Sequence, residues 1–390
     1  MEKRLGFVRV RVLTLMSMAG LLLLGAAVSQ VRLPLYRGLW YPATAEALRT
    51  ACEQYVNEAQ LPMPVRGRMV ACVAPNGGFM HSGSVAAHAF KPLQQGQYER
   101  VIVLTASHGT WFQGCSIPAV QYYASPLGLV PLDGSAARRA AWSSLIETRS
   151  VLYRNVSSTT KKRMPIHETE HGIEILLPFL QVQLGNFELV PIVVGDLHDA
   201  KGRLRLSAIN SIAEILKRTV DERTLIVVSS NLTYYGEQYR YTPFKEGAAE
   251  GIEWLDKQAL HFIMNRDLEG FRDYLAETRN PIDGAAPLAI MMALLPERVE
   301  AYLVNYQSNA RTMAEGGSSV SYAAIIFSDP AAPPNKPRAT EQIEPWQPAD
   351  TSDISLYGHM EPITGGDTAG RLSQGPAAPP EDSGEEDAGE

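Results

Sequence analysis

Residues 101–108 read VIVLTASH, a continuous apolar run that ends in a serine and a histidine. An apolar run bounded by polar or turn residues is typical of a strand that is covered on both faces. Similar runs recur along the chain, and we expect strands at 69–73, 101–105, 189–194, 225–228, 301–304 and 323–327.

Segments with the spacing of helices lie between these runs. We expect helices at 44–59, 174–184, 204–218, 247–264 and 268–277, the first of them capped by Thr44. Strands that alternate with helices predict an α/β domain, in the form of a three-layer α/β/α sandwich around a mainly parallel or mixed sheet.

Length and charge set limits on the class of protein. The chain has 390 residues and is 45% hydrophobic, which suits one large domain with a sizeable core. The net charge is −7, but residues 331–390 alone carry −9. The rest of the chain sums to +2, so no basic domain indicates nucleic acid as a partner.

Three cysteines, Cys52, Cys72 and Cys115, share no close spacing. This excludes a CxxC redox motif, a zinc ribbon and a disulfide framework. We expect buried, inert thiols, and a single Cys52–Cys72 bridge stays open if the domain is exported.

The N-terminus has the pattern of a membrane signal. Four basic residues lie within positions 3–11, and an uncharged run follows at 12–31. A run of about 20 residues is long enough to cross a bilayer as a helix, and the preceding positive charge places the main domain outside the cytoplasm. Residues 1–31 are thus predicted to be a single-pass membrane anchor, with the domain periplasmic if the source is bacterial. The alternative is a cleaved signal peptide and a secreted protein.

The composition changes again at Pro330. Residues 330–390 are rich in proline and acidic residues and poor in large apolar ones, which predicts a disordered tail. Trp346 and the apolar residues at 354–357 are exceptions that could dock on a protein partner.

Five short motifs carry the residues that could perform chemistry, at 74–79, 104–108, 170–174, 229–236 and 281–284. In an α/β sheet, ligands bind beyond the carboxyl ends of the strands. Most of these motifs follow predicted strands or end in glycine-bearing turns. We therefore expect one pocket formed by Asn76, His108, Asn231, Tyr234 and Asp283.

These motifs also carry a resemblance. The segments are RGLWYPA, APNGGFMHSG, VIVLTASH, HETEHGIEILLPFLQ, LVPIVVGDL, VVSSNLTYYGEQYRY and VNYQSNARTMAEGGSSVSYAAIIF. In number, order and spacing they resemble the MEMO family, also called AmmeMemoRadiSam system protein B, which is related in fold to the class III extradiol dioxygenases. The resemblance covers about residues 37–328, which we take as the domain.

The resemblance implies a metal site that this chain has largely lost. The family usually supplies two histidines and a cysteine as ligands, and those positions are Asn76, His108 and Asp283 here. The family's nearby aspartate and a further histidine correspond to Asn231 and Tyr234. Four of the five positions have changed.

His108 and Asp283 could still supply two donors, but an amide such as that of Asn76 is a poor ligand for a transition metal. His81 could be recruited as a third donor. We therefore predict no resident cofactor, and a divalent transition metal remains the alternative.

Glu170, His171 and Glu174 match the family. His171 and Glu174 lie three residues apart at a predicted helix start, so Glu174 could orient the imidazole or complete a helix cap. The catalytic candidates are accordingly His108, His171 and Glu174, although a structural pair explains the last two as well. His167 is predicted to be a solvated loop residue.

Three functions follow from these patterns. The first is a membrane-tethered, extracytoplasmic domain with a degenerate metal site, a pseudoenzyme that acts as a binding or structural subunit of a membrane-associated complex. The alternative is a divergent metal-dependent, oxidoreductase-like enzyme that uses His108 and Asp283. The third is a pocket that binds a small polar ligand without turnover through Asn76, Asn231 and Tyr234.

Overall fold

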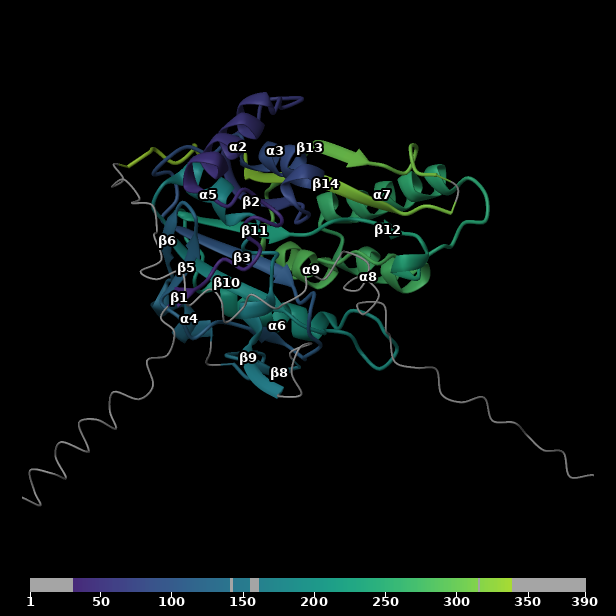
Figure 1. The fold of residues 1–390 in the computed structure, drawn as a ribbon, viewed down its shortest axis with the longest axis horizontal. Helices are drawn as coiled ribbons and strands as arrows, with labels where there is room; N and C mark the ends of the chain where they lie inside the picture. The colour runs from purple at the N-terminus through teal and green to yellow at the C-terminus, as the bar shows by residue number, and fades with distance from the viewer. Residues whose placement is uncertain (1–30, 141–142, 155–160, 315, 339–390) are drawn as a thin grey trace, which may run out of the picture.

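The structure is a computed structural model, and it describes residues 31–140, 143–154, 161–314 and 316–338 (Figure 1). Its main sheet has nine strands in the order β12-β14-β2-β11-β3-β10-β4-β7, with β13 paired to β14. The four central strands, β2, β11, β3 and β10, are parallel, whereas β14 and β13 are antiparallel. The predicted mixed α/β fold is confirmed.

The bounds of the strands contain all six predicted runs. The main sheet consists of β2 (Arg68–Ala74), β3 (Arg100–Ala106), β4 (Cys115–Ser116), β7 (Ile146–Glu147), β10 (Glu188–Val194), β11 (Thr224–Ser229), β12 (Tyr234–Tyr235), β13 (Glu300–Ser308) and β14 (Ser319–Asp329). Two small sheets are formed by β1 (Val31–Arg32), β5 (Tyr122–Ser125) and β6 (Gly128–Pro131), and by β8 (Ser150–Arg154) and β9 (Lys161–Pro165).

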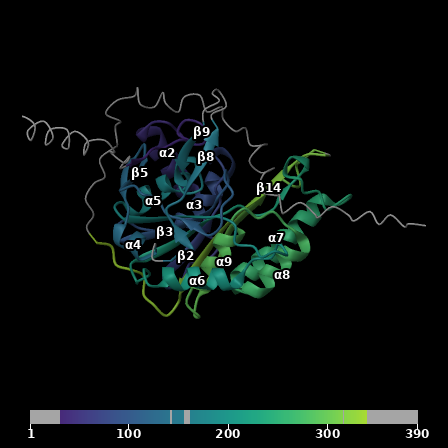
Figure 2. The same cartoon turned by 90° about the horizontal axis from the view of Figure 1, so that it is seen from below.

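Helices cover both faces of the main sheet. One apolar core contains Val101 and Val103 together with α2 (Ala45–Glu58), α3 (Ser84–Phe90) and α5 (Leu177–Leu184). The other contains Ile102 and Leu104 together with α6 (Leu206–Lys217), α7 (Ala248–Asn265), α8 (Leu268–Thr278) and α9 (Ala285–Leu294). Figure 2 shows α2, α3 and α5 on one side of β3 and β2, with α6 and α9 on the other. Successive residues of a strand point to opposite faces, which explains its uninterrupted apolar sequence.

The cap of α2 was predicted, whereas the helix α9 was not. Thr44 caps α2 as predicted, since its Oγ1 accepts from the Ala47 N–H at 3.3 Å. The sequence of α9, AAPLAIMMAL, is apolar on every side and lies buried between other elements, so it has no helical periodicity to detect. A short helix, α4 (Gly134–Ala140), was also not predicted.

The folded domain begins earlier in the chain than the predicted start at residue 37. Val31 and Arg32 form β1, which pairs in parallel with Tyr122 and Tyr123 of β5. The domain therefore includes residues ahead of the predicted start at 37. The predicted membrane span, residues 12–31, lies outside the described residues except for Val31.

Within the described residues, no helix is both long enough and apolar enough to cross a membrane. This finding contradicts the predicted membrane-tethered function and the single-pass localisation, and we correct both.

The beginning of the predicted tail packs on the domain. The Arg338 N–H donates to the Gly96 carbonyl at 3.0 Å, and its guanidinium pairs with Glu99. Arg223 Nη1 donates to the Lys336 carbonyl at 3.0 Å. Residues 330–338 are thus part of the folded unit, and the predicted disordered remainder, 339–390, lies outside the described residues.

The three cysteines are buried and form no disulfide. Burial raises the pKa of each thiol above its ordinary value, which makes the thiolate scarce.

Candidate functional site

The five residues expected to form one pocket meet at the carboxyl ends of the central strands. Asn76 follows β2, His108 follows β3, and Asn231 follows β11, with Tyr234 in β12. Asp283 lies in the turn that precedes α9. The parallel order β2-β11-β3 brings these strand ends together at one edge of the sheet.

The Asp283 carboxylate is the centre of this group. Its side chain is 1% exposed, and five donors from four segments of the chain satisfy it. Oδ1 accepts from the Asn231 N–H at 2.8 Å and from Ser230 Oγ at 3.1 Å, and Oδ2 accepts from Tyr234 OH at 3.0 Å, Asn76 Nδ2 at 3.2 Å and His108 Nε2 at 3.2 Å. Burial by itself would raise the pKa of Asp283, but these donors lower it below its ordinary value.

Asn76 and Asn231 bind each other directly. The Asn76 N–H donates to Asn231 Oδ1 at 3.0 Å, and Asn231 Nδ2 donates to Asn76 Oδ1 at 2.7 Å. Asn231 Nδ2 also donates to Tyr234 OH at 2.6 Å. Both amide side chains are therefore committed to their neighbours within the site.

His108 lies between two carboxylates. Its Nδ1 is 2.7 Å from Glu170 Oε1, its backbone N–H donates to Glu170 Oε2 at 2.9 Å, and its Nε2 faces Asp283. A carboxylate only accepts, so both ring nitrogens must carry protons and the ring is an imidazolium. Burial alone would lower the pKa of His108, but the two carboxylates outweigh it and raise the pKa to about 10.

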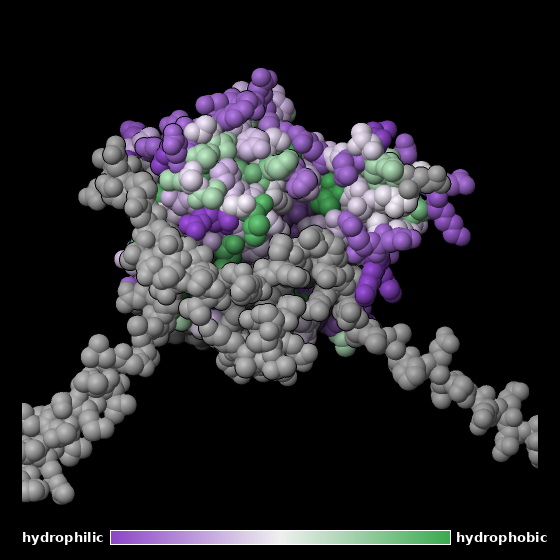
Figure 3. Space-filling model, in the orientation of Figure 1, coloured by the Kyte–Doolittle hydropathy of each residue, from purple (hydrophilic) through white to green (hydrophobic). Residues whose placement is uncertain are grey.

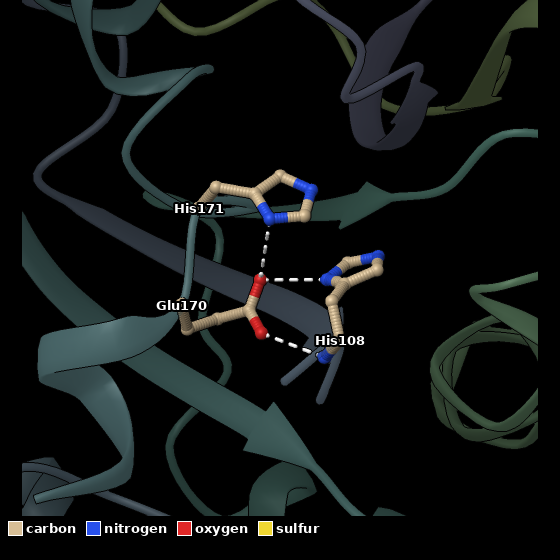
Figure 4. Close-up of side chains that lie close together, drawn as sticks. All are labelled: His108, Glu170 and His171. Carbon is tan, nitrogen blue, oxygen red and sulfur yellow. Dashed lines mark hydrogen bonds and ion pairs between the residues drawn. The ribbon is translucent and has the colours of Figure 1, made fainter. Parts of the chain in front are cut away.

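Glu170 is the site residue that sequence reasoning did not place. Besides His108, it accepts from the Gly172 N–H at 2.8 Å, and His171 Nδ1 lies 3.7 Å from the same Oε1 atom (Figure 4). Burial would raise the pKa of Glu170, but the charge and hydrogen bonds of His108, with a smaller contribution from His171, lower it to about 2. Its position next to His171 in the HETEHG segment could have indicated that it belongs to the site.

His171 is held against His108, with ring centroids 4.1 Å apart and 37° between the ring planes. Burial and the adjacent His108 charge lower the pKa of His171 to about 3, so this ring is neutral. Trp40 and Tyr36 cover it, with ring centroids 4.5 Å and 5.6 Å from its own. The two aromatic residues belong to the segment that precedes α2, and sequence reasoning did not assign them to the site.

Two glycines permit the close approaches that build the site. A side chain at Gly172 would clash with Thr105 Oγ1 of β3, and a side chain at Gly284 would clash with Ser230 after β11. These positions let the Glu170–His171 segment and the Asp283 turn lie directly on the strand ends.

Glu174, a catalytic candidate, lies elsewhere. It is fully buried and paired with Arg32, and it accepts from the Leu35 N–H at 3.1 Å, the Tyr36 N–H at 2.7 Å and Tyr41 OH at 2.6 Å. The prediction that Glu174 orients His171 is wrong, because Glu170 occupies that position. Glu174 instead fixes the segment that carries Tyr36 and Trp40.

Two other histidines also differ from their predictions. His81 lies in the short π-helical turn η1 (Phe79–Gly83) and is exposed, and among the described residues its ring has no partner in the site. His167 is buried rather than solvated. Its Nδ1 lies 2.6 Å from Tyr123 OH and its Nε2 lies 2.9 Å from the Ser116 carbonyl.

The residues at the family's ligand positions do not fit a transition metal. Asn76 offers an amide, and the Asp283 oxygens are occupied by five donors. His108, Glu170 and His171 do place one donor atom each within 4.8 Å of one another. His108 Nδ1 lies 2.7 Å and His171 Nδ1 lies 3.7 Å from Oε1 of Glu170, so this cluster, and not the family's ligand positions, is where the described residues bring three donors together (Figure 4).

Comparison with known proteins agrees with the resemblance that the sequence motifs carry. The profile of a family described as Memo-like protein matches residues 32–326. The chain is 28% identical to protein memo-1 homolog of Caenorhabditis elegans over 312 residues, which covers 76% of this chain and 82% of that protein. It is also 28% identical to Protein MEMO1 of Mus musculus and of Homo sapiens over 307 residues, which covers 74% of this chain and 94% of each relative.

Proposed function

Because the chain belongs to the Memo-like protein family, we propose that it is a non-catalytic member whose internal site binds a small polar ligand without a transition metal. The observation that carries this proposal is the state of Asp283 and His108. Asp283 accepts from five donors, and both His108 nitrogens face carboxylates.

The chemistry of the donors supports this proposal. A metal ion needs imidazole lone pairs and unoccupied anionic ligands. In this site a proton-bearing imidazolium supplies the positive charge that a metal would otherwise bring, and the carboxylates are satisfied by hydrogen bonds. Displacing those protons would break several buried hydrogen bonds at once, which opposes metal binding.

The proposal is tested by measuring the metal content of the purified full chain after separate exposure to iron(II), copper(II) and zinc(II), followed by removal of unbound ion. We expect substoichiometric metal in each case. The matched control is the double variant Asn76→His with Asp283→Cys, which restores the family's ligand types and should gain metal. Stoichiometric metal in the unmodified chain that disappears in His108→Ala would overturn the proposal and favour the metal-dependent enzyme.

A protein partner engaged by the C-terminal tail stays a prediction, since residues 339–390 lie outside the described residues. Deletion of 339–390 should release such a partner in a pull-down while the metal content and the near-ultraviolet circular dichroism of the domain stay unchanged. Retention of the partner by the truncated chain would assign the contact to the domain.

A further inference from the structure

We propose that residues 31–41 form a strap over His171 that detaches from the folded domain as a unit, with the Glu174 carboxylate as its anchor. Detachment exposes His171 and thereby controls access to the site. This inference rests on the proposed function, because it takes the site around His171 as the place where a ligand binds. Figure 1 shows the strap in dark purple, between β1 and α2.

The strap is anchored at one carboxylate. Glu174 is buried and accepts from four groups of the strap, which are the Arg32 guanidinium, the Leu35 N–H, the Tyr36 N–H and the Tyr41 hydroxyl. Donors from both ends of the strap therefore depend on the same buried acceptor. Groups that share one acceptor are coupled, so a weaker anchor weakens the whole strap at once.

The other hydrogen bonds of the strap include three to backbone carbonyls just ahead of Glu174. Arg32 Nε donates to the His167 carbonyl at 3.0 Å, and its Nη2 donates to the Glu170 carbonyl at 2.7 Å. The Tyr36 hydroxyl donates to the Thr169 carbonyl at 3.2 Å. The strap thus binds one short segment of the domain.

The strap takes no part in the main sheet. Its strand β1 has only two residues and pairs with β5 in the small three-stranded sheet. The strap can therefore leave without breaking a hydrogen bond of the main sheet, and a segment of this kind is typical of local opening below the free energy of global unfolding.

The tip of the strap is a turn closed on itself. The Gly38 N–H donates to the Tyr41 carbonyl at 2.8 Å. The Leu39 and Trp40 N–H groups donate to the Tyr36 carbonyl at 3.1 Å and 2.9 Å. Gly38 has a φ of +78°, which a glycine adopts without strain. These bonds lie within the turn, so its shape does not depend on the anchor.

The turn covers the site from the solvent side. The ring centroids of Trp40 and Tyr36 lie 4.5 Å and 5.6 Å from that of His171, which is only 8% exposed. Leu39, between them in the chain, is 63% exposed. Apolar side chains also reach the surface near the centre of the face drawn in Figure 3, beside a recess. Detachment of the strap removes both rings from His171 and opens the imidazole to solvent.

The test measures backbone hydrogen exchange of the full metal-free chain by mass spectrometry, in increasing urea below the unfolding transition. The strap peptide, residues 33–41, should exchange at a rate that changes little with urea, because local opening exposes little new surface. The β3 peptide, residues 99–106, should exchange faster with each addition of urea, because it requires global unfolding. The same urea dependence in both peptides would overturn the inference.

Tyr41→Phe and Tyr98→Phe are a matched pair of variants. Each removes one hydroxyl donor from a buried ring, since Tyr98 OH donates to the Met69 carbonyl at 2.6 Å, at the other end of the sheet. Tyr41→Phe should speed exchange of the strap peptide about fivefold or more. Tyr98→Phe should speed exchange of the β3 peptide and leave the strap peptide unchanged. Equal effects of the two variants on the strap peptide, or no effect of Tyr41→Phe, would contradict the anchor.

Exposure of His171 is followed with diethyl pyrocarbonate, which modifies imidazoles that solvent reaches. In the parent chain His171 should react slowly and the exposed His81 rapidly. Tyr41→Phe should speed the modification of His171 by about the same factor as the exchange of the strap peptide, with His81 unchanged. A constant His171 rate while exchange of the strap peptide rises would show that the strap does not cover the site.

The two proposals fail in different ways. A strap that opens only with global unfolding, in a chain that takes up no metal, refutes the strap alone. A chain that retains stoichiometric metal refutes the proposed function, whatever the exchange rate of the strap peptide.

Discussion

His108 Nε2 lies 3.2 Å from Oδ2 of Asp283, although 175 positions separate the two residues in the chain. A proton between them joins the loop after β3 to the turn before α9. Because Glu170 binds the opposite side of the same ring at 2.7 Å, the site is a continuous series of carboxylate, imidazolium and carboxylate. This series of hydrogen bonds connects the strand ends to the flanking loops.

Asp283→Ala should destabilise the chain by about 3–5 kcal/mol, because it leaves several buried donors and the His108 charge without their acceptor. The free energy of unfolding in urea measures this. The control, Glu222→Ala at an exposed position, should change stability by no more than about 0.5 kcal/mol. A loss below about 1 kcal/mol for Asp283→Ala would mean that the network contributes little.

His108 should make stability fall as the pH rises above neutrality. Burial would lower its pKa, but Glu170 and Asp283 raise it to about 10, above the ordinary value of 6.5. Its contribution is therefore complete below pH 6.5 and is lost as the pH approaches 10, at roughly 1.4 kcal/mol per pH unit. Urea unfolding between pH 7 and 9.5 measures the slope, and His108→Gln should remove it. An equal slope in both proteins would show that His108 is neutral in the folded chain.

The sequence was sufficient for the elements that have a strong local pattern. The apolar runs predicted the central strands, and polar residues at their carboxyl ends placed Asn76, His108 and Asn231 at one site because parallel strands end at the same edge. Asp283 was assigned to the same site because it lies in a glycine-bearing turn motif. The positions of the other three residues follow from the order of the parallel strands.

The roles of Glu170 and Glu174 could not be assigned in the same way. Both lie near His171 in a segment that forms turns rather than a regular helix, so spacing does not show which carboxylate faces the ring. The partner of Glu174 is Arg32, 142 positions away, in a segment that resembled the flank of a membrane anchor. Long-range partners of this kind leave no local signal in a single sequence.

His167 should make stability fall as the pH decreases. Burial lowers its pKa to about 4, so the neutral ring is favoured in the folded chain and the contribution is lost as the pH falls from 6.5 towards 4. The Tyr123 hydroxyl donates to Nδ1 and the Nε2–H donates to the Ser116 carbonyl, an arrangement that needs a neutral ring. His171, with a pKa of about 3, acts in the same range.

Urea unfolding between pH 6.5 and 4.5 should therefore show a slope of up to about 1.4 kcal/mol per pH unit for each of these two histidines. His167→Gln should reduce this slope by about the contribution of one histidine. A His167→Gln protein with the parental slope would show that His167 does not titrate differently in the folded and unfolded chains.

Arg32 and Glu174 should behave as a structural pair and not as part of the ligand site. Glu174→Gln or Arg32→Met alone leaves an unmatched buried charge and should cost about 3–5 kcal/mol, while the double variant should cost clearly less than the sum. A double-mutant cycle by urea unfolding measures the coupling. Glu174 also accepts a hydrogen bond from the Tyr36 N–H, so its loss should loosen the packing of Tyr36 and Trp40 on His171. The fluorescence of Trp40 should change as a result, measured in a chain whose other four tryptophans are replaced by phenylalanine. Additive single effects would mean that the two side chains stabilise the fold independently.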